Sequence, residues 1–356
     1  MKKPSQRKML IKLIAFMALS SLLISCETVG YYSQAARGQL QILSTRKPIL
    51  TLLSDENVVE ELKDKLRLAV SLKEFAAEEL MLPTSDNFDS YVDLNRDHVI
   101  WNVFAAPEFS LNPVNWCYPI AGCVSYRGYF SEENALRFAA SLEQEGFDVY
   151  TGGVDAYSTL GWFNDPLLST VMNRADYQLA GLVFHELAHQ VVYLKGDTTF
   201  NESFATTVER EGVKRWLQSI NQVELQDRAQ QDQARQADFL KLVLAYQEQF
   251  GGLYGGLLPD SEKREAKSEL QYSMRADYER LKMDWGGYSG YDNWIYNSLN
   301  NAQLSTVSSY NSLVPFFDNE LARLNGNLAE FYQRVKELAL MDGAQRQELI
   351  SRFDSY

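Results

Sequence analysis

The sequence predicts an α+β fold in which helices predominate and a small sheet lies near the middle of the chain. Helical periodicity runs through 55–82 and 131–146, and it resumes at about Arg174 and continues through most of the remaining chain. The aromatic stretch 99–130 contains Pro and reads as strands and loops. Hydrophobic residues make up 46% of the chain, which is enough apolar material for a core and argues against intrinsic disorder.

The individual elements follow from local patterns. A strand is predicted over 147–157, because β-forming residues lie on both sides of Gly152 and Gly153, and the glycines indicate a bulge or a close backbone approach. One helix is predicted over 174–195, and a second from about Glu202 to Phe250. The other expected elements are a helix over 30–43, a loop over 251–256, and several later helices interrupted at 285–291.

The N-terminal segment has the layout of a secretory signal peptide. A basic leader precedes an apolar run over 13–24 that is too short to span a bilayer comfortably. The run ends in Leu23-Ile-Ser-Cys26, which resembles a bacterial lipobox. Residues 1–25 are therefore expected to be a lipoprotein signal peptide, Cys26 the lipidated first residue, and 26–356 a single domain. The alternative is an ordinary signal peptide or an N-terminal anchor with a chance cysteine.

This segment also sets the expected location and the charge of the mature chain. Glu27 after the cysteine favours lipid anchoring to the outer membrane, on the periplasmic side of the cell envelope. The segment holds five of the 34 basic residues and none of the 47 acidic ones, so the mature chain has 29 basic residues and a net charge near −18. A protein this acidic does not follow a phosphate backbone, so nucleic-acid binding is not expected.

The motif His185-Glu-Leu-Ala-His189 carries the chemistry. Two histidines four positions apart on a helix leave the same face one turn apart, which lets both imidazoles reach one zinc ion. Glu186 can then reach a zinc-bound water without displacing a ligand. The chain has three histidines in all, and two are in this motif. A pair of core histidines is the alternative, but a buried glutamate between them is costly without a metal.

A catalytic zinc usually has three protein ligands and an open position. The best candidate for the third ligand is Glu202, which is far enough from the motif for a helix end, a turn and a return. A capping box formed by Thr199 and Glu202 is the alternative role for this glutamate. Asp197 and Glu209 are rival ligands, and Glu209 is better placed as a hydrogen-bonding partner of a ligand.

Cys117 and Cys123 are the cysteines that follow Cys26. The Tyr-Pro-Ile-Ala-Gly segment between them is turn-like, and export permits a disulfide, so a bond between the two is favoured over two free thiols.

A helix with this motif, followed by Asn201-Glu-Ser-Phe-Ala205, resembles the gluzincin metallopeptidases, whose third ligand often lies in an Asn-Glu-x-x-Ala segment. The gap between the two motifs is shorter here than in the best-known aminopeptidase branch. The chain is more similar to a family of bacterial lipoproteins described as zinc aminopeptidases. That resemblance covers nearly the whole mature chain, including 31–34, 121–130 and 300–302. It implies a gluzincin-like fold with a small sheet beside the zinc-binding helix.

The resemblance also suggests substrate-binding residues. An aminopeptidase needs a carboxylate for the free α-ammonium group, and Asp155 on the glycine-rich predicted strand is similar in placement to the amine-binding acid of gluzincin aminopeptidases. A turn aspartate is the alternative. Tyr310 is preferred over Tyr157 as the donor that stabilises the oxyanion, because gluzincins often place this donor after the zinc helices. His98 is expected to be structural.

Together these observations predict a zinc-dependent peptidase of the cell envelope, an aminopeptidase that hydrolyses peptides with a zinc-bound water activated by Glu186. A zinc endopeptidase is the alternative within the enzyme class. A lipoprotein that binds envelope partners without hydrolysis is the alternative from another class, but such a module has no need of Glu186.

Overall fold

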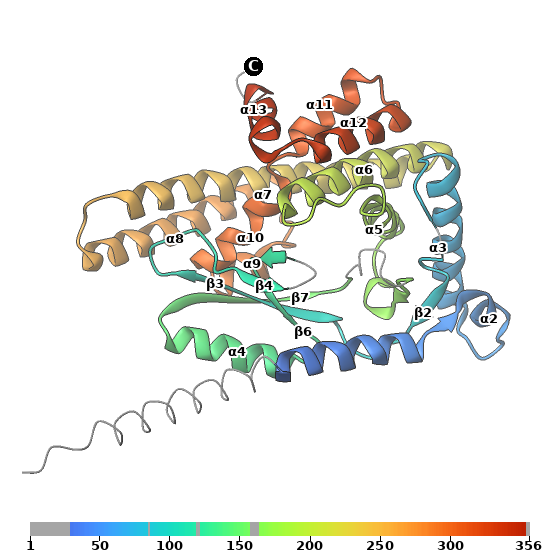
Figure 1. Cartoon of the computed structure of the whole chain (residues 1–356), viewed down its shortest axis with the longest axis horizontal. Coiled ribbons are helices and arrows are strands. Elements are labelled where there is room, and N and C mark those ends of the chain that lie inside the picture. Colours follow the sequence, from blue (N-terminus) through green and yellow to red (C-terminus); the bar gives the residue numbers. More distant parts are fainter. Residues whose placement is uncertain (1–28, 85, 119–121, 157–163, 354–356) are drawn as a thin grey trace, which may run out of the picture.

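The computed structural model describes residues 29–84, 86–118, 122–156 and 164–353, and it places the backbone alone at 308–311 and 352–353. Cys26 and Tyr157 lie outside the described residues. The molecule is a mostly helical α+β protein with small sheets, as the sequence predicts (Figure 1). None of the helices in the described part of the chain has the length and apolar character needed to cross a membrane.

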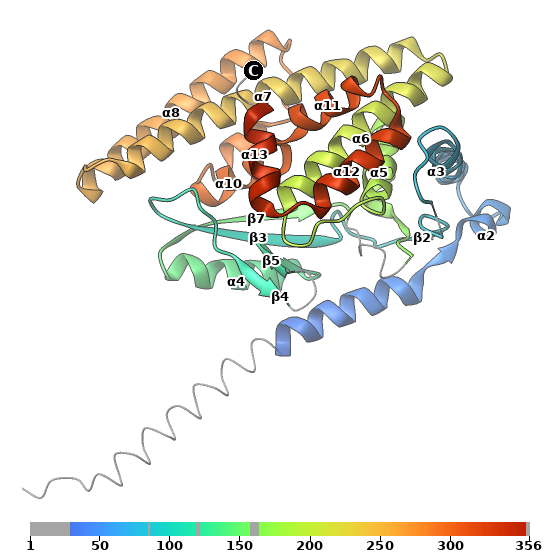
Figure 2. The ribbon, with the colours of Figure 1, turned by 45° about the horizontal axis from the view of Figure 1, so that its top comes forward.

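The centre of the fold is a pair of helices, α5 (Asp176–Ala188) and α6 (Thr198–Ser219). Both contribute fully buried apolar side chains to the largest core cluster, which also includes α3 (Glu60–Glu78). Three C-terminal helices complete this layer in Figures 1 and 2: α11 (Val314–Arg323), α12 (Leu328–Leu340) and α13 (Gly343–Phe353). Aromatic rings interlock between them, with Phe204 of α6 against Phe317 and Phe331.

An antiparallel sheet lies on one side of this helical layer, with strand order β6-β3-β7. Its strands are β3 (Ile100–Pro107), β6 (Arg127–Tyr129) and β7 (Phe147–Val154), and α4 (Glu132–Gln144) covers the face away from α5 and α6 (Figure 1). The ladder between β3 and β7 is continuous through Gly152 and Gly153, so no bulge forms there. Gly153 instead leaves room for the His98 ring, because a Cβ at this position would lie 2.2 Å from that ring.

The smaller elements connect these layers. β2 (Ser90–Val92) pairs antiparallel with β1 (Lys47–Pro48) and parallel with β8 (Leu167–Leu168). β4 (Trp116–Tyr118) and β5 (Gly122–Val124) form a hairpin in which Cys117 and Cys123 are joined by a disulfide. The remaining short helices are α2 (Ile49–Ser54) and the 3-10 turn Ser169–Val171, and a further helix spans 29–45.

A long helical hairpin, α7 (Val223–Gly255) and α8 (Asp260–Asp284), extends from the layer and has its own apolar cluster. α9 (Asp292–Tyr296) and α10 (Asn301–Asn311) return the chain to the sheet. Lys267 of α8 is buried and lies 2.6 Å from a carboxylate oxygen of Asp148 on β7, which also accepts a hydrogen bond from the Asn301 backbone. These buried polar contacts tie the hairpin and α10 to the edge strand β7.

Two predicted helix boundaries are wrong. The helix predicted over 174–195 ends at Ala188, and the loop after it is held by Asn201, whose amide side chain bonds both the N–H and the carbonyl of Leu194 at 2.7 and 2.9 Å. The helix predicted from Glu202 to Phe250 is two helices, because the chain turns at Asn221, which has a φ of 52°. The predicted loop over 251–256 is also wrong, since α7 continues through Gly255.

Candidate metal centre

Helix α5 supplies the first ligands from its C-terminal turns. Its apolar side chains, among them Val183, Phe184 and Leu187, are fully buried in the core. His185 lies in the last turn and His189 is the C-cap, with helical backbone angles (φ −59°, ψ −20°). The two rings therefore keep the helical spacing, and their centroids are 5.0 Å apart. The motif lies on the helix that the sequence predicts, at its end rather than in its middle.

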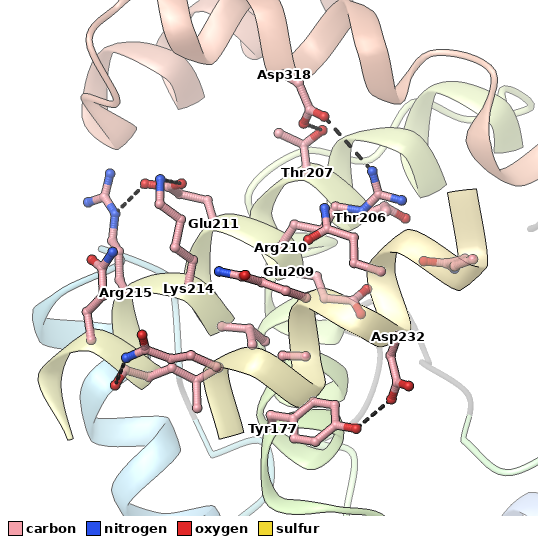
Figure 3. Close-up of a pocket in the computed structure, with 18 of the residues that line it drawn as sticks. Tyr177, Thr206, Thr207, Glu209, Arg210, Glu211, Lys214, Arg215, Asp232 and Asp318 are labelled. Atoms are coloured by element: carbon pink, nitrogen blue, oxygen red, sulfur yellow. Dashed lines mark hydrogen bonds and ion pairs between the residues drawn. The ribbon is translucent and has the colours of Figure 1, made fainter. Parts of the chain in front are cut away.

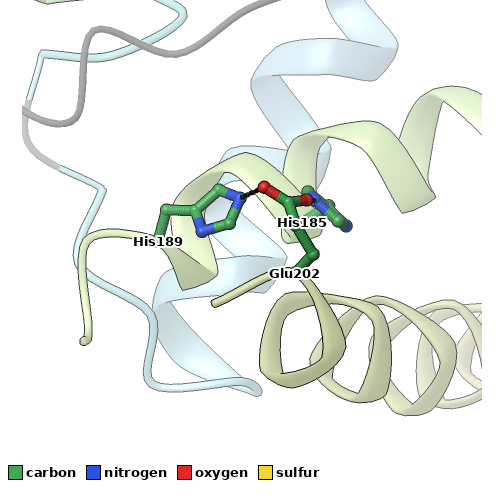
Figure 4. Close-up of side chains that lie close together, drawn as sticks. All are labelled: His185, His189 and Glu202. Carbon is green, nitrogen blue, oxygen red and sulfur yellow. Dashed lines mark hydrogen bonds and ion pairs between the residues drawn. The ribbon is translucent and has the colours of Figure 1, made fainter. Parts of the chain in front are cut away.

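The third candidate ligand, a carboxylate, comes from α6. The Asp197 side chain caps this helix, accepting a hydrogen bond from the Phe200 backbone at 3.0 Å, and it also lies 3.3 Å from Arg346. With Asp197 as the N-cap, the capping box between Thr199 and Glu202 does not form, and Glu202 lies in the second turn. Its side chain is directed toward the two imidazoles (Figure 4).

The three side chains lie close enough together to hold one metal ion. Nε2 of His185 lies 3.2 Å from Oε2 of Glu202, and Nε2 of His189 lies 3.8 Å from Oε1 of the same carboxylate (Figure 4). One potential ligand atom from each of the three residues lies within 4.8 Å of the others. Ligand atoms at about 2.0–2.1 Å from a tetrahedral ion are separated by about 3.3–3.4 Å. His185, His189 and Glu202 could therefore hold a metal ion with little movement.

Glu209 contacts the imidazole of His185 on the nitrogen that faces away from Glu202. Its Oε2 lies 3.0 Å from Nδ1 of His185, so the imidazole is held between two carboxylates. Gly181, one turn before His185, makes the contact possible, because a Cβ there would lie 3.0 Å from Oε1 of Glu209. A carboxylate on the far nitrogen orients the ring and makes the other nitrogen a better ligand.

Burial and hydrogen bonding shift the pKa values of the two histidines in opposite directions. Burial alone would lower the pKa of His185, but hydrogen bonds to Glu202 and Glu209 raise it well above its ordinary value. Burial, together with the nearby His185, lowers the pKa of His189 to about 4. Nδ1 of His189 is buried and has no hydrogen-bond partner among the described residues. His189 is thus a neutral imidazole, which is the form that binds a metal.

Glu186 follows His185 in the chain, and one of its carboxylate oxygens is buried. Its Oε2 has no hydrogen-bond partner in the described part of the chain. Burial, together with the negative charges of Glu202 and Asp165, raises its pKa to about 7 against the opposing effect of His185. It borders a cavity of about 20 Å³ that Asp165 and Gln190 also line. A buried carboxyl group with a pKa near neutrality is typical of a general base or acid.

The other predicted site residues are placed as follows. Oδ1 of Asp155 lies 2.7 Å from Nδ1 of His98, and its Oδ2 lies 3.3 Å from a guanidinium nitrogen of Arg174. His98, which was expected to be structural, thus contacts Asp155, the residue predicted to bind the substrate's amine. Tyr310 lies in α10, but its side chain is outside the described residues. The roles of Asp155, Tyr310 and Cys26 stay predictions.

Three residues near the centre were missed by sequence reasoning. Burial and the negative charge of Glu202 together raise the pKa of Tyr126 to about 12, so this tyrosine lies within electrostatic reach of that carboxylate. Tyr193 has a raised pKa from the same two causes. Asp165 is the third, beside Glu186. With 20 tyrosines in the chain, no local pattern marks the two that approach Glu202.

A larger, polar pocket of about 850 Å³ lies between α6 and α7, and Glu209 also borders it (Figure 3). Its charged side chains largely pair with one another: Arg215 and Lys214 with Glu211, at 2.8 and 3.1 Å, and Tyr177 with Asp232. The Glu209 side chain is 38% exposed. Glu209 thus lies between this pocket and His185, which it contacts through Nδ1.

Comparison with known proteins identifies a family for the chain. No curated protein and no solved structure matches the chain. A family model described as "Putative aminopeptidase" matches residues 30–350, which include every helix and strand that contributes to the metal centre. The chain therefore belongs to this aminopeptidase family.

Proposed function

We propose that the protein is a zinc-dependent aminopeptidase. The observation that carries the proposal is the convergence of His185, His189 and Glu202 beside Glu186, whose buried Oε2 has no hydrogen-bond partner among the described residues. A core built only for stability has no use for four ionisable groups packed together. Two imidazole nitrogens with one carboxylate oxygen form a donor set typical of catalytic zinc. Family membership supports peptides as the substrate class.

Zinc, when bound, would polarise the scissile carbonyl and lower the pKa of a coordinated water. The protein's own groups would do the rest. Glu186 would take the proton of the attacking water and then deliver it to the leaving amine, which requires a carboxyl group with a pKa near the working pH. Glu209 would keep His185 in one tautomer and one orientation. The buried apolar side chains of α5 would limit the access of bulk water to the motif.

The oxyanion of the tetrahedral intermediate needs a hydrogen-bond donor. Tyr310 is the residue predicted from sequence. Tyr126 and Tyr193 are supported as alternatives by their electrostatic coupling to Glu202. A phenol with a raised pKa stays protonated at neutral pH, so it can donate.

Metal analysis combined with a peptide survey tests the proposal. Purified protein should bind about one zinc per chain, and it should release amino acids from peptides with free N-termini. Peptides with acetylated N-termini should be poor substrates. Equal cleavage of free and acetylated peptides would instead identify a zinc endopeptidase. Zinc binding without cleavage of any peptide would favour the binding-module alternative.

We also propose that the mature protein is lipid-anchored through Cys26 in the cell envelope, on the basis of the basic leader, the apolar run and the lipobox-like tetrapeptide. Cys26→Ala should leave unprocessed precursor and no lipidated form, as seen by labelling with a fatty-acid analogue. Normal processing and acylation of this variant would contradict the anchor. Cys117→Ala is the matched control, since it alters a cysteine outside the leader.

A further inference from the structure

We propose that the polar pocket between α6 and α7 binds a neutral saccharide that carries acetamido groups. Its walls come from these two helices, from α11, from the start of α5 and from the segment after α8 (Figure 3). The volume is about 850 Å³, and ligand pockets in proteins usually measure about 300–1,000 Å³. The pocket therefore has room for more than one sugar ring. This inference goes beyond the proposed peptidase function and does not depend on it.

The pocket lies behind the candidate metal centre and is separate from it. Glu209 borders the pocket and contacts Nδ1 of His185, whereas Glu202 faces Nε2 of the same ring. His185, His189 and Glu202 are all described residues, and none of them lines the pocket. A molecule bound in the pocket is therefore not the peptide that would be cleaved at the metal.

The charges of the wall favour a neutral ligand. The acids Glu209, Glu211 and Asp232 have the partners described above. The fourth acid, Asp318, lies 4.0 Å from Arg210. Each basic residue of the described wall also has an acidic partner, because the other two pair with Glu211. A charged ligand would have to break one of these contacts and leave a group unpaired, which costs free energy.

Uncharged amides are the groups that remain free to bind a ligand. Gln230, Gln233 and Gln236 are exposed residues of α7, and their spacing of three places them in a row along the pocket. Their side chains make no hydrogen bond to any other described residue. Each amide offers two N–H donors and one carbonyl acceptor. Hydroxyl and acetamido groups also both donate and accept, so a saccharide matches this row.

The apolar part of the wall fits the rest of such a ligand. Val213, Leu217 and Leu321 line the pocket, and they offer a surface for the methyl group of an acetamido substituent. Tyr288 also lines it and is 37% exposed, and the apolar body of a tyrosine can pack against the C–H face of a sugar ring. An extended peptide is usually bound through a sheet edge. The described residues of this pocket lie in helices and turns, which favours a saccharide over a peptide.

Calorimetric titration of the mature protein with N,N′,N″-triacetylchitotriose tests the proposal. We expect saturable binding at one site with a Kd below about 1 mM, and at least about 5-fold weaker binding of cellotriose, which lacks the acetamido groups. The double variant Gln230→Ala, Gln233→Ala should bind chitotriose at least about 10-fold more weakly. Gln231→Ala is the matched control, because Gln231 is exposed on the same helix but does not line the pocket. This control should bind as tightly as the unmodified protein.

The inference and the proposed function can fail separately. A chelator that removes the metal should leave chitotriose binding unchanged. Binding that disappears with the metal would place the saccharide at the metal centre and overturn the inference. If chitotriose binds as expected but no peptide is hydrolysed, the inference stands and the proposed function fails.

Three further results would overturn the inference. One is the absence of saturable chitotriose binding up to about 10 mM. Another is unchanged binding in the folded double variant, because the saccharide would then lie elsewhere. The third is tighter binding of acetyl-trialanine amide that the double variant loses, which would identify a peptide site. Alanine favours helix formation, so the variants should fold, as circular dichroism checks. If the double variant does not fold, Gln233→Ala alone should weaken chitotriose binding at least about 3-fold.

Discussion

The two histidines of the candidate metal centre lie one helical turn apart, yet the regions that hold them differ. His185 lies inside α5, with Glu209 on Nδ1 and Glu202 facing Nε2. His189 is the C-cap, and its buried Nδ1 has no partner among the described residues. The first ligand is therefore oriented by hydrogen bonds and the second by packing at the helix end. We expect changes around His185 to act through metal affinity and ring orientation, and changes around His189 to act mainly through the ligand itself.

The largest expected effect comes from removing either ligand. His185→Ala and His189→Ala should both lose the metal, with a lower melting temperature of the zinc-loaded protein. In metal-free protein the two should differ, since His185→Ala also leaves Glu202 and Glu209 without their hydrogen-bond partner. Thermal unfolding with a chelator should show the larger loss for His185→Ala. Equal losses of melting temperature in the two metal-free variants would contradict the difference proposed between the surroundings of His185 and His189.

Next in size is the effect of Glu186→Gln on catalysis. The amide keeps the shape of the side chain but cannot accept a proton, so peptide hydrolysis should fall by at least roughly 100-fold while zinc stays bound. Steady-state kinetics and metal analysis on the same sample separate the two properties. Full activity in this variant would remove Glu186 from the mechanism.

Glu209→Gln should have an intermediate effect, confined to the His185 side. Loss of the carboxylate on Nδ1 should weaken zinc binding by roughly 10–100-fold, which competition with a chelator measures. Glu211→Gln is the matched control, because Glu211 is on the same helix and pairs with Arg215 instead. If Glu211→Gln weakened zinc binding as much, the effect would come from the loss of any negative charge on α6 and not from the contact with His185.

The smallest effect is expected from Gly181→Ala. The added methyl group would meet Glu209 at 3.0 Å, so it should destabilise the fold by about 1–3 kcal/mol and weaken zinc binding slightly. Gly251→Ala, in the exposed part of α7 where nothing lies within 4 Å, should instead stabilise the protein. Denaturant unfolding compares them, and a neutral Gly181→Ala would show that Glu209 can move without cost.

The motif, the helical class and the candidate third ligand could be predicted because each depends on local pattern. The pairing of His185 with His189 follows from helical spacing alone. The approach of Glu202 requires only that the next helix returns toward the two histidines. The break at Asn221 carried a local signal that was missed, since Asn is among the residues that adopt a positive φ most readily.

Residues brought in by long-range contacts could not be predicted. Asp165 is positioned by Asn87 and Phe88, nearly eighty residues earlier, and no periodicity encodes that contact. The end of α5 depends in the same way on the Asn201 side chain. For Asp155, the sequence located the strand but did not reveal that Arg174 and His98 occupy its carboxylate.

The central claim is that His185, His189 and Glu202 hold one catalytic zinc. X-ray absorption at the zinc edge of the unmodified protein tests it most directly. We expect about one zinc per chain with two imidazole nitrogens and carboxylate or water oxygens at about 2.0–2.2 Å. A bound zinc whose spectrum lacks imidazole scattering, or one that persists unchanged in His189→Ala, would contradict the account.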